Sequence, residues 1–68
     1  MRTYGRLREL IKLRFGTLGN FAEVMGMSRS ALSHKLNGLV PWKHSEIEKV
    51  CNLLDIPMTL VGEYFFYE

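Results

Sequence analysis

The stretch FAEVMGMSRSALSHKLNG, residues 21–38, constrains the fold more than any other part of the chain. It holds two short segments with helical periodicity on either side of Gly26. A glycine can enter the left-handed conformation that ends a helix without steric cost, and Ser28 is a good cap for the next helix. The stretch therefore predicts two helices joined by a tight turn, over about 17–25 and 28–37.

The rest of the chain also shows helical signals. Apolar residues recur at helical spacing over residues 3–15, and Ser45 and Glu48 have the spacing of a capping box in front of a helix over 46–54. A fifth, short helix is expected from Met58 to about Gly62, after Pro57. The predicted fold class is all-α, a compact domain of five helices.

Length and composition allow one domain, spanning residues 1–68. A domain of this size buries only about 60% of the surface of its unfolded chain, so a helix with many exposed polar side chains is unexpected. The single cysteine, Cys51, excludes an internal disulfide and a cysteine-based zinc site. Neither a membrane span nor a signal peptide is evident, and we expect a cytoplasmic protein without membrane partners.

The charges are unevenly distributed, although their formal sum is only +2. Residues 1–14, 15–27, 28–44 and 45–68 carry +4, −1, +3 and −4, respectively. No carboxylate occurs from Val24 to Ser45. A solvated helix face would explain such a bias, but its coincidence with the polar third helix favours a surface for a polyanion.

Spacing assigns the two faces of the third helix. Ala22 is small where the second and third helices are expected to cross, and Leu32 anchors the third helix from beneath. The inner side then consists of Ala31, Leu32 and Leu36. The outer side presents short or polar side chains, which suit a DNA groove better than a core: Ser28, Arg29, Ser30, Ser33, His34 and Asn37.

At these residues the chain resembles the helix-turn-helix transcription regulators of the phage repressor and Cro type. GMSRSALSHKLNG is similar to the turn and recognition helix of small regulators of phages from Gram-positive hosts, and SEIEKVCNLLDIP to their fourth helix. The resemblance covers nearly the whole chain. It implies a lambda-repressor-like domain whose helices two and three form the helix-turn-helix, and a repressor that binds double-stranded operator DNA as a homodimer. Because the candidate dimer patch is small, we expect the free protein to be largely monomeric and the dimer to form fully only when two copies share an operator.

The resemblance also implies roles for individual residues. The residues expected to contact base edges are Arg29, Ser30, Ser33 and His34. Those expected to contact phosphates are Thr17, Asn20, Ser28, Asn37 and Lys43. Each of the charged or ionisable members has a plainer alternative: Arg29 as a surface charge or a phosphate contact, His34 as a surface histidine without a role, and Lys43 as a solvated lysine.

Two positions depart from the family pattern. Leu18 stands where the family often has a glutamine that holds a phosphate, so this contact must come from Thr17, Asn20 or a backbone amide. Lys35 stands where an apolar residue is usual, and Leu36 is expected to take over its packing.

No catalytic constellation, metal set or phosphate-binding glycine loop is present in the sequence, so an enzyme, a cofactor and a small-molecule ligand are not expected. The competing function is a helical protein-interaction module, such as an antirepressor, that keeps the fold without reading DNA. The aromatic tail Tyr64-Phe65-Phe66-Tyr67 supports self-association under either function. Phe65 is assigned mainly to the core and Phe66 and Tyr67 to a dimer contact, with Leu13 and Leu39 as the next candidates.

Overall fold

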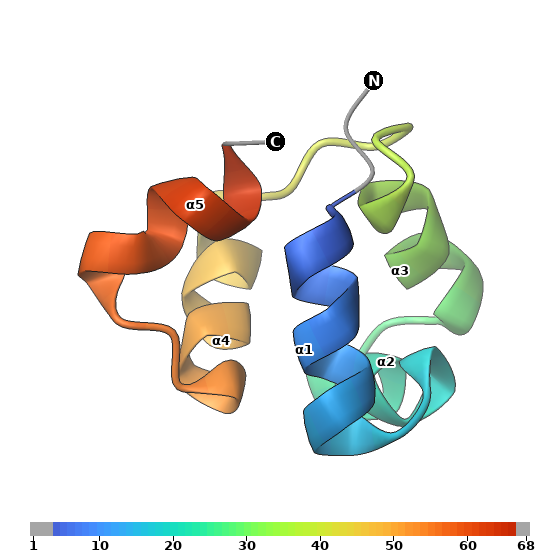
Figure 1. Cartoon of the computed structure of the whole chain (residues 1–68). Coiled ribbons are helices and arrows are strands. Elements are labelled where there is room, and N and C mark those ends of the chain that lie inside the picture. The colour runs from blue at the N-terminus through green and yellow to red at the C-terminus, as the bar shows by residue number, and fades with distance from the viewer. Residues whose placement is uncertain (1–3, 67–68) are drawn as a thin grey trace.

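A computed structural model describes residues 4–66, and this part of the chain contains helices and no strand. The elements are α1 Gly5–Phe15, α2 Leu18–Met25, α3 Arg29–Leu36, α4 His44–Leu54, the 3-10 helix η1 Met58–Leu60 and α5 Val61–Phe65. In Figure 1, α1 runs through the middle of the domain, with α4 and α5 on one side of it and α2 and α3 on the other. The prediction of a compact all-α domain with five helices is confirmed for these residues. The fifth helix, expected from Met58, starts as the 3-10 helix η1 and becomes α-helical only at Val61.

The predicted caps and turn of α2 and α3 are confirmed. The Thr17 hydroxyl accepts a hydrogen bond from the backbone N–H of Asn20 at 3.1 Å, and the Ser28 hydroxyl accepts one from the N–H of Ala31 at 3.0 Å. Gly26 has a φ of 79° and ends α2 in the left-handed conformation. Local sequence signals therefore define both ends of the turn.

The start of α1 differs from the prediction, which placed it at residue 3, outside the described residues. Tyr4 has a φ of 51°, so the helix begins only at Gly5. The Tyr4 ring packs edge-on against Trp42 and Phe65, with ring centroids 6.2 and 6.3 Å away. This aromatic contact offsets the cost of a left-handed tyrosine.

The predicted capping box of α4 is wrong. The helix begins at His44, so Ser45 lies inside its first turn. Lys43 is the N-cap, and Glu46 Oε1 accepts the backbone N–H of Lys43 at 2.9 Å. Glu46 is held in place by a second contact, to α3, which the spacing of nearby residues does not reveal.

The core lies between α1 and the other helices. Its buried members are Leu7, Ile11, Phe21, Ala22, Met25, Leu32, Leu36, Val50, Cys51, Leu54, Ile56 and Phe65. Cys51 is buried as predicted, and burial raises the pKa of its thiol, so it behaves as a small apolar side chain. Within residues 4–66 no helix is both long and apolar enough to cross a membrane.

The backbone at Gly26 gives a test of the turn. A Cβ at this position meets no atom within 4 Å, so only the positive φ opposes a side chain. We expect Gly26→Val to destabilise the domain by about 1–2 kcal/mol and to lower Tm by roughly 5–15 °C. Gly26→Asn is the matched control, because asparagine tolerates this conformation, and it should retain most of the stability. Equal melting temperatures for the wild type and Gly26→Val would contradict the assignment.

Candidate nucleic-acid interface

The rotation of α3 about its axis is set by three buried side chains. Leu32 and Leu36 are fully buried, and Lys35 between them is only 6% exposed. Lys35 Nζ lies 2.9 Å from Glu46 Oε1 and donates to the carbonyl of Pro41 at 3.3 Å. The expectation that Leu36 alone would replace the usual apolar residue is therefore incomplete, because the lysine stem is also buried and its ammonium is paired.

This rotation turns the predicted base-contacting residues outward. Arg29, Ser30 and His34 are exposed, and Ser33 is half-buried along the same side of α3. Ser28 precedes them and Asn37 follows them, both exposed. The structure thus brings the predicted α3 residues onto one solvent-facing side, and none of them is a carboxylate.

The first turn of α2 lies beside the first turn of α3. The Cδ of Arg29 is 3.8 Å from the position that a Cβ of Gly19 would occupy, and Thr17 Oγ1 is equally close to that position. Asn20 donates an amide proton to the carbonyl of Phe15 at 2.9 Å, which joins α2 to the end of α1. Thr17 and Arg29 therefore both lie beside Gly19, and Asn20 is exposed in the same turn of α2.

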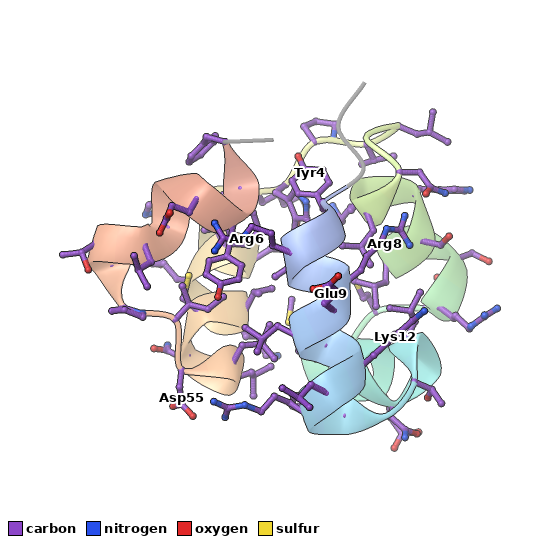
Figure 2. The ribbon with its side chains drawn as sticks, viewed as in Figure 1. Tyr4, Arg6, Arg8, Glu9, Lys12 and Asp55 are labelled. Atoms are coloured by element: carbon purple, nitrogen blue, oxygen red, sulfur yellow. The ribbon has the colours of Figure 1, made fainter. Side chains whose placement is uncertain are left out.

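At its other end, α3 is bound by a residue of α1. Arg8 Nη2 donates to the carbonyl of Leu36 at 3.0 Å and also to Oδ1 of Asn37. Figure 2 shows the Arg8 side chain extending from α1 toward α3. Lys43 is exposed as the N-cap of α4, after the loop that leaves α3. The predicted phosphate contacts thus form two groups along the chain: Thr17, Asn20 and Ser28 at the N-terminal ends of α2 and α3, and Asn37 and Lys43 after α3.

Sequence reasoning missed the cations that hold α2 and α3. Arg8 was counted only as part of a basic segment, yet it binds the end of α3. Lys49 Nζ, from α4, donates to the carbonyl of Met25 at the end of α2, at 3.2 Å. A cation near a helix C-terminus is a known stabilising pattern, but here the cation and the helix end are far apart in the sequence.

Two further cations of α1 face the acidic C-terminal part of the chain. Arg6 pairs with Glu63 at 3.4 Å, and Arg14 pairs with Asp55 at 2.9 Å. Figure 2 shows Arg6 on the α5 side of α1, whereas Arg8 and Lys12 extend toward α3 and α2. Exposed pairs such as these contribute about 1 kcal/mol or less. Their main effect is that positive charge of α1 is matched on the side away from α3.

Glu46 is the carboxylate that follows the acid-free stretch, and it faces inward. Burial raises the pKa of Glu46, but the hydrogen bond from the backbone of Lys43 and the pairing with Lys35 outweigh burial, so the net pKa lies below the ordinary 4.5. The ionised form is therefore the one that the fold stabilises. Its charge is compensated by Lys35 and not displayed beside the outer side of α3.

A depressed carboxyl pKa makes stability depend on pH in a defined direction. The contribution of Glu46 is fully present above about pH 5 and is lost as the pH falls through and below 4.5. We expect thermal unfolding of the wild type to show this loss between about pH 5 and 3, and Glu46→Gln to show less pH dependence there, with lower stability at pH 7. Parallel curves for the two proteins would mean that Glu46 makes no such contribution.

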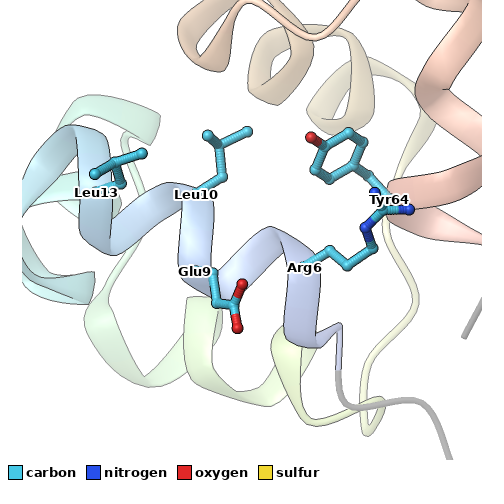
Figure 3. A pocket seen from close by; sticks show the side chains of 5 residues that line it. All are labelled: Arg6, Glu9, Leu10, Leu13 and Tyr64. Carbon is cyan, nitrogen blue, oxygen red and sulfur yellow. The ribbon is translucent and has the colours of Figure 1, made fainter.

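Apolar side chains exposed on other surfaces include the predicted dimer residues. Phe65 is buried, as assigned, whereas Phe66 is 59% exposed; Tyr67 lies outside the described residues. Leu39 is 63% and Leu13 80% exposed. Leu13 borders a groove of about 240 Å³ between α1 and α5, which Figure 3 shows lined by Arg6, Glu9, Leu10, Leu13 and Tyr64.

One comparison with known proteins places the chain in a family. The chain belongs to the DUF739 family, described as a protein of unknown function, which it matches over residues 2–68. No curated protein matches the chain. The match covers all five helices as one unit, and the function must be inferred from the geometry given above.

Proposed function

We propose that this member of the DUF739 family is a sequence-specific regulator of transcription, a phage Cro-like repressor that reads operator half-sites with α3 in the major groove. In this proposal α2, the turn at Gly26 and α3 act as a helix-turn-helix of the lambda-repressor-like type. One observation carries the proposal: the outer side of α3 consists of short polar and basic side chains, while Leu32, Lys35 and Leu36 hold its inner side in the domain.

The chemistry of these side chains fits the edges of bases. An arginine can donate to both O6 and N7 of guanine, and serine hydroxyls and the imidazole can donate or accept. Arg29, Ser30, Ser33 and His34 are spaced so that successive turns of α3 present them along one groove. The short serines allow the helix backbone to approach the bases closely. A surface meant for protein packing would present larger apolar side chains here.

The two groups of predicted phosphate contacts would then flank the reading residues. Thr17, Asn20 and Ser28 lie at the N-terminal ends of α2 and α3, where backbone N–H groups also favour anions. Asn37 and Lys43 lie beyond the C-terminal end of α3. Phosphate contacts on both sides of a groove fix the position of a reading helix but add no sequence information themselves.

A single copy is too small to read a complete operator. The domain extends 27 Å at most, which is less than the roughly 34 Å between successive major grooves on one face of DNA. Two copies are therefore part of the proposal. Exposed Phe66, with Tyr67, is the proposed dimer contact.

The proposal is tested by selecting bound sequences from a pool of random duplexes. We expect enrichment of a two-fold symmetric site and a dissociation constant that rises steeply with salt. A protein that enriches no sequence and shows no salt-dependent binding is not a DNA-binding repressor. An interaction module of the antirepressor kind would give this result.

Arg29 provides the first test of the reading residues. Arg29→Ala should weaken binding to the selected site by about 1–3 kcal/mol while binding to unrelated DNA changes little. The control is Arg6→Ala, which removes the same charge from the side that faces Glu63 and should affect both DNAs little. An equal loss on selected and unrelated DNA would make Arg29 a phosphate contact.

The tail provides the test of the dimer. Replacing Phe66 and Tyr67 by serine should keep the helical content and weaken binding to a site with two half-sites far more than binding to one half-site. Gel-shift titrations of the two duplexes measure the difference, and circular dichroism checks the fold. If both duplexes lose affinity equally, the contact must be sought at Leu13 or Leu39, which are also exposed.

A further inference from the structure

The C-terminal end of α3 is held by Arg8 of α1, which makes two hydrogen bonds there that we call the Arg8 fork. Arg8 Nη2 donates both to the carbonyl of Leu36 and to Oδ1 of Asn37. Arg8 is half-buried as a residue, and its hydrogen bond to the carbonyl of Leu36 is part-buried, whereas the one to Asn37 is exposed. The two acceptors belong to consecutive residues at the C-terminus of α3, and a planar guanidinium suits such neighbouring acceptors.

The fork determines which group Asn37 can offer to a partner. With Oδ1 accepting from Arg8, the remaining amide group of Asn37 is its NH2, on an exposed residue. Phosphate oxygens only accept hydrogen bonds, so an outward NH2 matches a phosphate and an outward carbonyl oxygen would not. Without Arg8, the amide would be free to turn over.

The positive charge of Arg8 also favours a phosphate beside Asn37. The C-terminal end of a helix carries partial negative charge on its last carbonyls, which would repel a DNA backbone. The guanidinium on the carbonyl of Leu36 compensates that charge. Both effects favour an anion beside Asn37.

We propose that Arg8 is a positioning residue for DNA binding: it orients Asn37 as a hydrogen-bond donor to a phosphate and fixes the C-terminal end of α3 in the groove. This inference rests on the proposed function. It assigns to α1 a role in recognition through α3, which is distinct from a long-range field of its basic residues.

A double-mutant cycle on the selected duplex tests the inference. Arg8→Ala and Asn37→Ala should each weaken binding about tenfold, the factor at the lower end of the range for one hydrogen bond to a charged group. The double variant should lose clearly less than the hundredfold expected of two independent contacts, because both changes remove the same phosphate contact of Asn37 and only the smaller charge effect of Arg8 at the Leu36 carbonyl is lost in addition. Arg14→Ala is the matched control, since it removes an arginine of α1 that pairs with Asp55, and it should change affinity by less than about twofold.

The other outcomes overturn the inference. Additive losses, with the slope of affinity against salt reduced by about 1 in Arg8→Ala, would make Arg8 a direct phosphate contact. An unchanged affinity would show that the fork has no role in binding. If Arg8→Ala fails to fold by circular dichroism, Arg8→Met replaces it in the cycle, because methionine keeps a long unbranched side chain and has no hydrogen-bond donor; additive losses there would again contradict the inference.

The wild type in the same titrations distinguishes a failure of the proposed function from a failure of the inference about Arg8. If it binds no duplex, the proposed function and the inference both fail. If it binds the selected duplex and the cycle is additive, only the inference fails.

Discussion

The contact between Lys35 and Glu46 is the interaction on which the candidate interface depends. Lys35 lies on the buried side of α3 with Leu32 and Leu36, and its ammonium reaches a carboxylate of α4. A buried ion pair adds little net stability, but removing one partner of such a pair typically costs about 3–5 kcal/mol. Rolling α3 about its axis would break the pair and expose both leucines. The pair therefore opposes other orientations of α3, and the outer side of the helix follows from this.

Long cationic side chains also hold helices in place elsewhere in the domain. A chain of 68 residues has a small core, and the short helices α2 and α3 leave carbonyls at their ends that need partners. Arg8 and Lys49 supply two of these partners, from α1 and α4. Polar contacts at helix ends thus help to fix the positions of the helices, which a larger core does in a bigger domain.

Acidic and basic side chains lie on different sides of the domain. The carboxylates of Asp55 and Glu63 pair with arginines of α1 on the side of the domain that holds α4 and α5. The outer side of α3 carries Arg29 and His34 and no acid. A polyanion approaching α3 would meet donors and positive charge, and the acidic surface would remain available to another partner. This separation makes the proposed DNA contact and the proposed dimer contact compatible.

The sequence by itself determined the parts of the structure that depend on neighbours within a few residues. Thr17 and Ser28 cap helices, Gly26 makes the turn, and helical spacing placed Arg29, Ser30 and His34 on the exposed side of α3, because each rule acts within one or two helical turns. Spacing also put Ala31 on the inner side, but Ala31 is only half-buried and Lys35 is buried instead. Only the tertiary structure decided the partners of Lys35, the start of α4 and the fork from Arg8. The reason is distance along the chain: Arg8 lies 28 residues from the carbonyl it binds, and no local rule states which helix end will come beside a given cation. The candidate interface residues can therefore be proposed from local sequence, while the contacts that hold those residues in position come from packing.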